Sequence, residues 1–471
     1  MNTKPSITLA LAANDLLIFP PEGSTPEVLQ GQLRAAGWQG RTVLDARRKC
    51  LRALPIDYPA LCAALQARYS FRPQFDPRPD LERVVHVAQQ PRPYQSDALG
   101  AWEAAGHRGV VVLPTGAGKT LVGLLALAAL NTKTLVCVPT LDLLGQWRAS
   151  LLSNTDLREE DVGTWGGGDK DLRSVTVITY DSAAIHTRIL GQFGLLIFDE
   201  VHHLPADTYR TVAEGAIATA RLGLSATPER SDLRHSDLDL LVGPVVYERL
   251  PAQLRDERHI ADYRTEQITV ALTGEERTAY ARAAEVYRAF LRRHRISMRS
   301  GADYERQLIW RSGNDPRARE ALLAHQAARK IALTASGKMD VVAGLLDRHR
   351  DDRVLIFSEY NSLVDDLGRR FCLPVVTHKT PAQERKAILD GFRSGRYSKL
   401  ATGRVLNEGV DLPDANVAII LSGSATRREF IQRLGRVLRP KQTEAVLYEV
   451  VTEDSTEEGI SRRRQSAPAT P

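Results

Sequence analysis

The chain has 471 residues, and its 63 Lys and Arg residues exceed its 57 Asp and Glu residues by 6. At about 150 residues per domain, this length predicts about three compact units and excludes a single small module. The hydrophobic fraction of 43% and the charged fraction of 25% are ordinary for a globular protein and exclude a mainly disordered, collagenous or coiled-coil chain. The longest apolar stretch, Leu121–Leu130, is far shorter than the roughly 20 residues of a membrane-crossing helix, so no membrane partner is expected.

The first 80 residues predict a small separate domain. Apolar runs at Ile7–Ala13 and Leu16–Phe19, with Asn14 and Asp15 between them, predict a strand, a turn and a second strand rather than a signal peptide. Three prolines in Pro73–Pro79, with charged residues among them, are typical of a linker. Four scattered cysteines without paired spacing argue against disulfides or a zinc site, and we expect a cytoplasmic protein.

Two sets of short apolar runs, each alternating with helical segments, predict two separate parallel sheets. The runs are rich in β-branched residues and largely apolar throughout, as in strands that are buried on both faces. The first set comprises Val110–Leu113, Thr134–Val138, Val175–Thr179, Leu195–Phe198 and Leu222–Ser225, and the second comprises Val354–Phe357, Val375–Thr377, Val417–Leu421 and Val446–Val451. The predicted fold class is therefore α/β, with two parallel-sheet domains after an N-terminal α+β domain.

Residues 275–330, between the two sets, show no strand pattern and are predicted to be helical. Tyr280, Ala284, Tyr287 and Leu291 recur at helical spacing and give one apolar face. The segment holds 13 Lys and Arg against 7 Asp and Glu, so its excess of positive charge equals that of the whole chain. Arginine-rich helical faces are commonly only solvated, and nucleic-acid binding is the alternative.

A glycine-rich loop, LPTGAGKT, follows the first predicted strand and precedes an apolar helix. Small residues in such a loop let backbone N–H groups and the helix N-terminus surround phosphate oxygens. Lys119 is expected to reach the β- and γ-phosphates of a nucleotide, and the Thr120 hydroxyl to hold Mg²⁺. Leu113 replaces the usual first glycine. A turn that merely joins strand and helix is the alternative. The predicted nucleotide-binding residues are Pro114, Thr115, Gly116, Ala117, Gly118, Lys119 and Thr120.

Two carboxylates follow the predicted strand Leu195–Phe198, in the sequence DEVHH. They are expected at the carboxyl edge of the sheet, where open α/β folds bind ligands. Asp199 is expected to hold Mg²⁺ through water, and Glu200 to accept a proton from the attacking water. An isolated acidic pair is more often an exposed strand end, but Lys119 earlier in the chain favours the functional interpretation. The adjacent histidines have no third ligand nearby, so His202 is interpreted as a coupling residue and not as a zinc ligand.

A basic helix is predicted in the second α/β unit, at the sequence QRLGRVLR. Arg436 and Arg439 are three residues apart and share a helix face, so both guanidinium groups can address one anion. If they act across a domain cleft, they would neutralise charge on the transferred phosphoryl group, as an arginine finger does. For an arginine pair alone, a solvated basic helix is the commoner explanation.

The order of these motifs resembles the superfamily two helicases and translocases. Within that superfamily the chain most resembles the XPB-type DNA helicases in their short archaeal and bacterial form. The motifs that carry the resemblance are PTGAGKT, DEVHH, GLSATP at 223–228, NEGVDLP at 407–413 and QRLGRVLRP, together with RPYQ at 92–95, VPT at 138–140 with Gln146 and Trp147, TYDSA at 179–183 and GPVVYE at 243–248.

The resemblance implies an ATP- and Mg²⁺-dependent DNA motor with two RecA-like domains, an N-terminal damage-recognition module and an arginine-rich helical thumb. The catalytic residues it implies are Lys119, Asp199, Glu200, His202, Gln432, Arg436 and Arg439. Further nucleotide contacts are implied at Arg92, Gln95, Gly409 and Asp411, with Gln95 on the adenine. The implied DNA-binding residues are Thr140, Thr179, Arg230, Asp232, Arg292, Arg293, Arg295 and Arg299.

The resulting domain prediction divides the chain into five parts. They are an N-terminal domain at 1–80, a first RecA-like domain at 81–270, the thumb at 271–335, a second RecA-like domain at 336–460 and a mobile tail at 461–471.

Two functions are compatible with these motifs. The first is an ATP-driven motor that acts as a monomer on duplex or forked DNA, in DNA repair. The second is an ATP-gated clamp on duplex DNA that recruits a partner nuclease and unwinds little. The family's Arg-Glu-Asp unwinding element is here Arg230, Ser231 and Asp232, and loss of its central acid puts strand separation in doubt. An RNA helicase or the motor of a restriction system would share the ATPase, but the sequence contains no nuclease constellation, and XPB-type motifs favour DNA.

Overall fold

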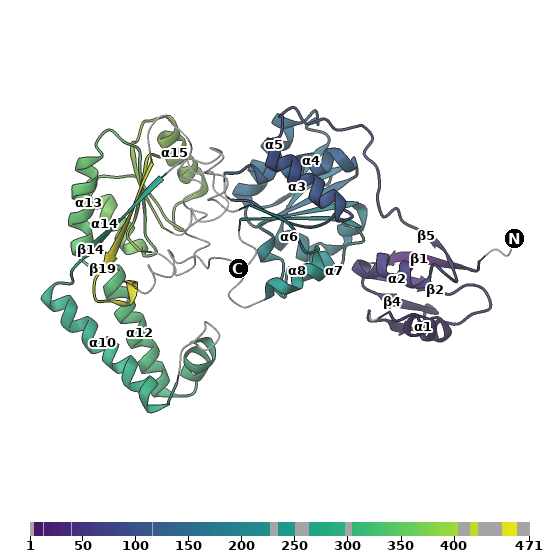
Figure 1. Ribbon diagram of the computed structural model, residues 1–471, viewed down its shortest axis with the longest axis horizontal. Helices are drawn as coiled ribbons and strands as arrows, with labels where there is room; N and C mark the ends of the chain where they lie inside the picture. The colour runs from purple at the N-terminus through teal and green to yellow at the C-terminus, as the bar shows by residue number, and fades with distance from the viewer. Residues whose placement is uncertain are drawn as a thin grey trace. The chain divides into compact units, whose positions relative to one another are not determined.

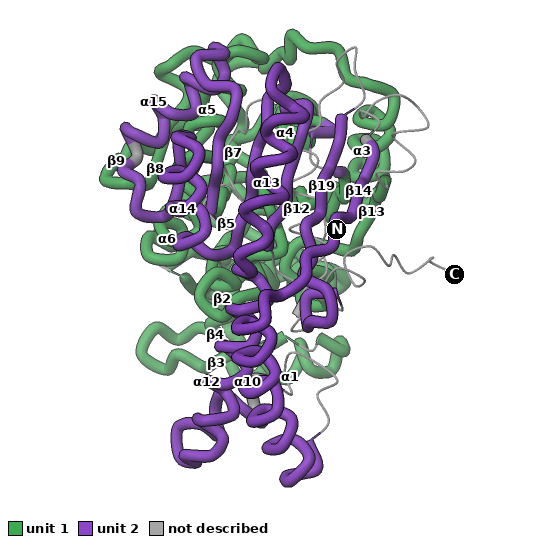
Figure 2. The backbone as a smooth tube through the Cα atoms, turned by 90° about the vertical axis from the view of Figure 1, so that its left-hand side faces the viewer, with its two compact units in different colours: residues 1–113, 118–249 green, residues 114–117, 250–471 purple. Residues whose placement is uncertain are grey.

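A computed structural model describes residues 4–12, 14–38, 40–114, 116–226, 234–249, 263–296, 304–403, 415–422 and 445–458. The chain divides into two compact units (Figure 2). The first comprises residues 1–113 and 118–249, and the second comprises residues 114–117 and 250–471. None of the helices within the described ranges is long and apolar enough to span a bilayer.

The first unit begins with a five-stranded sheet in the order β3-β4-β2-β1-β5 (Figure 1). Its elements are β1 (Ser6–Ala12), β2 (Asp15–Phe19), α1 (Pro26–Ala35), β3 (Val43–Asp45), β4 (Cys50–Ala53), η1 (Pro55–Asp57), α2 (Tyr58–Leu65) and β5 (Ser70–Pro73). β1 and β2 pair antiparallel, which confirms the predicted strand, turn and strand. Ile7 and Leu9 lie two residues apart in β1, so they share one face and pack in one core with Leu29 and Leu33 of α1.

The chain after this sheet is hydrogen bonded to the rest of the first unit. The carbonyl oxygen of Pro79 accepts from Lys133 N at 2.8 Å and from Thr132 Oγ1 at 2.6 Å. Ala88 N donates to Asn154 O at 2.8 Å. These bonds join the end of the predicted linker, and the segment that follows it, to the larger sheet and its helices.

An eight-stranded sheet in the order β13-β6-β12-β11-β7-β10-β8-β9 forms the rest of the first unit. Its strands are β6 (Arg108–Val112), β7 (Thr134–Val138), β8 (Val162–Gly166), β9 (Asp169–Lys170), β10 (Val175–Thr179), β11 (Leu195–Asp199), β12 (Ala220–Ser225) and β13 (Val245–Glu248). All neighbours pair in parallel except β8 and β9. Every residue of β7, β10 and β11 is buried, as the sequence predicts.

Helices cover both faces of this sheet (Figure 1). On one side lie α3, α4 and α5, and on the other lie α6, α7 and α8. The helices are α3 (Pro93–Ala104), α4 (Lys119–Leu130), α5 (Leu141–Asn154), α6 (Tyr180–Ile185), η2 (Thr187–Gln192), η3 (Val201–His203), α7 (Arg210–Glu214), η4 (Arg234–Asp237) and α8 (Leu238–Leu241). Two parallel neighbouring strands need a crossover connection that runs over one face of the sheet, and this connection is usually a helix. The layering therefore follows from the alternation of strands and helices along the chain.

The second unit contains a six-stranded parallel sheet in the order β14-β19-β18-β15-β17-β16. Its elements are β14 (Tyr263–Val270), α13 (Gly337–Arg348), β15 (Val354–Phe357), α14 (Asn361–Phe371), β16 (Val375–Val376), α15 (Ala382–Arg393), β17 (Lys399–Thr402), β18 (Val417–Ile420) and β19 (Ala445–Thr452). The structure corrects the predicted boundary at residue 270, because β14 pairs along its whole length with β19 of this sheet.

A helical hairpin of α10 (Gly274–Arg293) and α12 (Pro316–Leu333) projects from the second sheet, with the π-helical turn η5 (Glu305–Trp310) before α12 (Figure 1). Thr273 and Glu276 form a capping box that starts α10. Tyr280 and Ala284 are buried in one hydrophobic cluster with residues of α12. Tyr287 and Leu291 are partly buried and pack against a second cluster between the same two helices. The apolar face predicted for this region is confirmed.

Candidate nucleotide site and nucleic-acid contacts

The glycine-rich loop in LPTGAGKT, called the P-loop below, joins the carboxyl end of β6 to the N-terminus of α4. Gly116 and Gly118 have φ angles of +83° and +77°, a region that strains any residue with a side chain. The Lys119 ammonium donates to the carbonyl oxygen of Leu113 at 3.2 Å. Because the loop leads directly into α4, it ends at a helix N-terminus. Backbone N–H groups and the helix dipole there favour an anion such as a phosphate.

The predicted carboxylates lie at the same edge of the sheet as the P-loop. Asp199 ends β11, and only β12 separates β11 from β6. Asp199 is paired in register with Leu224 of β12, which is paired with Val111 of β6. Thr120 lies in the first turn of α4, directly after β6 and the loop. Because these parallel strands end together, the hydroxyl, the carboxylate and the P-loop lie where open sheets bind ligands.

Both oxygens of the Asp199 carboxylate accept hydrogen bonds. Oδ1 accepts from Glu200 N at 3.0 Å, and Oδ2 accepts from Trp147 Nε1 at 2.7 Å. The backbone carbonyl of Asp199 accepts from Tyr180 OH at 3.0 Å. Burial raises the pKa of Tyr180 well above its usual value, so this phenol remains a donor. Trp147 and Tyr180 stand in motifs that carry the family resemblance, but the motifs alone assign them no role.

His202 lies between Glu200 and Ser225. Its Nδ1 is 3.5 Å from Glu200 Oε2 and 3.4 Å from Ser225 Oγ. Ser225 ends β12, and its carbonyl oxygen accepts from Leu113 N at 3.0 Å. One buried histidine thus contacts both the predicted base and the strand that leads into the GLSATP motif. Its role as a coupling residue stays a prediction.

Gln95 connects α3 to the P-loop. Its Oε1 accepts from Arg92 N at 2.8 Å, and its Nε2 donates to Gly118 O at 3.4 Å. A Cβ on Gly118 would lie 2.5 Å from this Nε2, so glycine also makes room for the contact. The adenine contact of Gln95 and the nucleotide contact of Arg92 stay predictions.

Thr140 lies two residues after the end of β7, and Thr179 is the last residue of the neighbouring strand β10. Thr140 caps α5 by accepting from Leu143 N at 3.3 Å, and Thr179 caps α6 by accepting from Ser182 N at 3.3 Å. Threonine is a favoured N-cap because its oxygen satisfies a helix N–H group. Capping alone explains both residues, so their contacts to DNA phosphates stay predictions.

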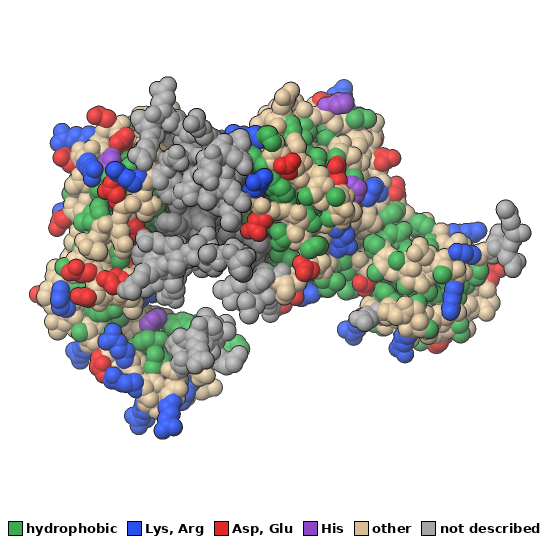
Figure 3. Space-filling view, in the orientation of Figure 1, with side chains coloured by type: hydrophobic (Ala, Val, Ile, Leu, Met, Phe, Trp, Pro, Cys, Tyr) green, Lys and Arg blue, Asp and Glu red, His purple; other side chains and the backbone are tan. Residues whose placement is uncertain are grey.

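Among the described residues, the predicted DNA-binding arginines of the hairpin are exposed to solvent. Arg292 and Arg293 lie in the last turn of α10, and Arg295 follows it. Arg292 forms an ion pair with Glu285 of the same helix at 2.5 Å. Lys and Arg side chains gather over the hairpin on the face that Figure 3 shows. This positive surface fits a polyanion but does not by itself identify one.

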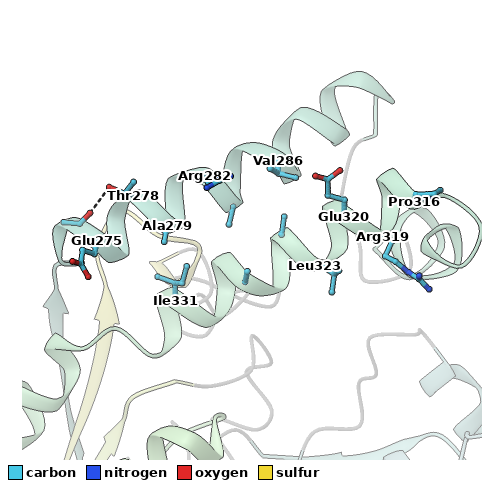
Figure 4. Close-up of a pocket in the computed structure, with 14 residues that line it drawn as sticks. Glu275, Thr278, Ala279, Arg282, Val286, Pro316, Arg319, Glu320, Leu323 and Ile331 are labelled. Atoms are coloured by element: carbon cyan, nitrogen blue, oxygen red, sulfur yellow. Dashed lines mark hydrogen bonds between the residues drawn. The ribbon is translucent and has the colours of Figure 1, made fainter.

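A groove of about 1260 Å³ lies between α10 and α12 (Figure 4). Its lining is mainly apolar and includes Leu323, of which 58% is exposed. Charged side chains of both signs also line it, namely Arg282, Arg319, Glu275 and Glu320. These charges balance, so electrostatics gives the groove no preference for an anion.

The remaining predicted site residues lie outside the described residues. They are Thr115, Arg230, Asp232, Arg299, Gly409, Asp411, Gln432, Arg436 and Arg439. The predicted tail at 461–471 lies outside them as well. The roles predicted for these residues rest on the sequence.

The fold and the described site define a class of protein. A P-loop and an Asp-Glu pair share one edge of a parallel sheet, and a second parallel sheet follows in the chain. This is the architecture of a motor protein with two RecA-like domains. The crystal structure of the Pyrococcus furiosus Hef helicase domain has the same fold, with a TM-score of 0.55 at 18% identity over 81% of this chain and 100% of that chain.

Sequence comparison identifies the family. Residues 88–230 match "Type III restriction enzyme, res subunit", and residues 319–467 match "ERCC3/RAD25/XPB C-terminal helicase". The "DNA 3'-5' translocase XPB2" of Sulfurisphaera tokodaii is 40% identical over 79% of this chain and 84% of that protein. The "DNA 3'-5' helicase XPB" of Mycobacterium tuberculosis is 34% identical over 80% of this chain and 63% of that protein, so the chain spans less than two thirds of this bacterial relative. The chain belongs to the XPB family of DNA helicases and translocases.

Proposed function

We propose that this chain is an ATP-dependent DNA translocase with the 3′–5′ polarity printed in the names of its relatives. The observation that carries the proposal is the meeting of Lys119, Thr120, Asp199 and Glu200 at one sheet edge in a chain of the XPB family. No observation favours the clamp, which would use the same edge without moving along DNA.

The residues at this edge fit ATP and Mg²⁺. Mg²⁺ takes hard oxygen ligands and usually keeps several of its waters, so the Thr120 hydroxyl would hold the ion directly and the Asp199 carboxylate would hold it through water. When bound, the nucleotide would supply the phosphoanhydride bond whose hydrolysis drives the motor, and the ion would neutralise charge on the phosphates. Lys119 binds the phosphates, and Glu200 accepts a proton from the water it orients. His202 passes a shift of Glu200 to Ser225, because it contacts both side chains.

Three further parts of the proposal rest on the sequence. Arg436 and Arg439 would neutralise charge on the phosphoryl group, with Gln432 beside them. A monomeric motor would suffice, because one chain carries both RecA-like domains. Recruitment of a partner nuclease stays a prediction.

Triplex displacement tests translocation separately from unwinding. With ATP, the chain is expected to displace a third strand from duplex DNA, because displacement requires movement but no separation of the duplex. Unwinding of a forked duplex is expected to be weaker, since Ser231 replaces the acid of the unwinding element. Fluorescent third-strand release and strand release from the fork measure the two activities. ATP hydrolysis that double-stranded, forked and single-stranded DNA all fail to stimulate would contradict the proposal, and stimulation by RNA alone would favour an RNA helicase.

The hairpin arginines are expected to contribute a salt-sensitive grip on DNA. Replacing Arg292 and Arg293 by alanine should reduce the slope of log affinity against log salt by about 0.9 for each phosphate that the variant no longer binds. Fluorescence anisotropy with labelled duplex DNA at several salt concentrations measures the slope. Arg350→Ala is the control, because Arg350 is similarly exposed and pairs with Asp347, three residues earlier in the chain. An equal decrease of the slope in the control would show a nonspecific effect of net charge.

A further inference from the structure

Trp147 donates a hydrogen bond to Asp199 in the candidate site, and the motifs do not explain this contact. Trp147 lies in α5 and is 1% exposed, and its Nε1 donates to Asp199 Oδ2 at 2.7 Å. An indole N–H can only donate, and a bond from it to an ionised carboxylate is stronger than a neutral one. The contact therefore ties a fixed donor to one oxygen of the predicted Mg²⁺ residue.

The helix that starts at the P-loop makes room for this indole. A Cβ on Gly123 of α4 would lie 2.6 Å from Cη2 and 3.3 Å from Cζ3 of Trp147. Only glycine leaves the ring where it is, because both ring atoms belong to a rigid, buried side chain. The indole thus packs on the helix that begins with Lys119 and Thr120 and reaches the strand end that carries Asp199.

The carboxylate of Asp199 is held at both oxygens. Trp147 Nε1 donates to Oδ2, and Glu200 N donates to Oδ1 at 3.0 Å. The carboxylate cannot rotate about χ2 without breaking both bonds. Each oxygen of a carboxylate has two acceptor sites, so both oxygens retain capacity for a second partner.

We propose that Trp147 is a positioning residue that holds the Asp199 carboxylate in the orientation that takes Mg²⁺. The inference rests on the proposed function and assigns a residue that the P-loop and Asp-Glu motifs do not contain. Partners that orient the ligands of a metal ion contribute about 10–100-fold to its affinity.

Trp147→Phe tests the proposal, because it keeps an aromatic ring and removes the N–H group. Binding of a fluorescent ADP analogue to the full chain is measured with Mg²⁺ and with EDTA. The tightening produced by Mg²⁺ is expected to fall about tenfold, while the affinity in EDTA stays at the wild-type value. Trp102→Phe is the matched control: Trp102 is buried in the same unit, and its Nε1 donates to Arg221 O at 2.9 Å, away from Asp199. This control is expected to change neither affinity.

A pair of glycine variants tests the same contact without altering the indole. Gly123→Ala should displace the ring and reduce the tightening by Mg²⁺, and it decides the question if Trp147→Phe does not fold. Gly145→Ala on α5 should have no effect, since a Cβ there meets nothing within 4 Å. The positioning role would be overturned if Mg²⁺ tightened binding of the ADP analogue as much in the folded Trp147→Phe or Gly123→Ala variant as in the wild type. It would also be overturned if Trp102→Phe lost as much of this tightening as Trp147→Phe. An unmodified chain that binds no nucleotide would overturn the proposed function instead.

Discussion

Replacing Lys119 by alanine is expected to slow DNA-stimulated ATP hydrolysis by at least about 100-fold and to leave the fold intact. Lys119 is the partly exposed first residue of α4, and alanine is the best helix former. The ammonium is the charge expected to meet the β- and γ-phosphates, and a fixed charge contributes most where negative charge develops in the reaction. Phosphate release with and without duplex DNA measures the loss.

Lys133→Ala provides the control for this loss. Lys133 is also partly exposed, but it precedes β7 at the opposite edge of the same sheet. Its backbone N–H donates to Pro79 O at 2.8 Å, a bond that alanine keeps. We expect wild-type hydrolysis from this variant. If Lys119→Ala hydrolysed ATP at the wild-type rate, or if both variants were slowed equally, the role assigned to the P-loop lysine would be wrong.

Strands could be predicted from the sequence where both of their faces are buried. Thr134–Val138 and Val175–Thr179 match β7 and β10 residue for residue, because every side chain is buried and none needs to be charged. A strand at the edge of a sheet does not show this continuous run of apolar residues. Residues 263–270 mix charged and apolar side chains, since β14 has one neighbouring strand and partly exposed side chains, and their pairing with β19 could not be read from their pattern.

For the candidate site, the sequence predicts which elements meet but not what holds them. A loop after one strand and two carboxylates after another suffice to place Lys119 and Asp199 at one edge. The bond from Trp147 to Asp199 spans 52 residues, and the bond from Gln95 to Gly118 spans 23. Both depend on how the helices pack against the sheet. Periodicity reports which face of a helix is buried, but it does not report which atom that face will meet.

Replacing Lys338 by methionine is expected to destabilise the second unit by about 3–5 kcal/mol, the cost of leaving a buried partner charge unpaired. Lys338 of α13 and Glu457 are both buried, and the ammonium donates to the two carboxylate oxygens at 2.9 and 2.7 Å. It also donates to the carbonyl oxygens of Leu421 and Val450. Hydrogen exchange should accelerate at the amides of β19 and stay unchanged at those of β7 in the first unit, as measured by mass spectrometry.

The double variant Lys338→Met with Glu457→Leu separates the effect of the unpaired charge from that of the altered packing. Two apolar side chains bury no charge, so most of the stability should return. Recovery should stop short of the wild-type value, because the carbonyls of Leu421 and Val450 lose a donor in the double variant as well. Arg370→Met, which breaks an exposed ion pair with Asp340 of α13, should cost less than about 1 kcal/mol. A double variant as unstable as the single one would mean that the carbonyl bonds or the packing, and not charge pairing, make Lys338 necessary.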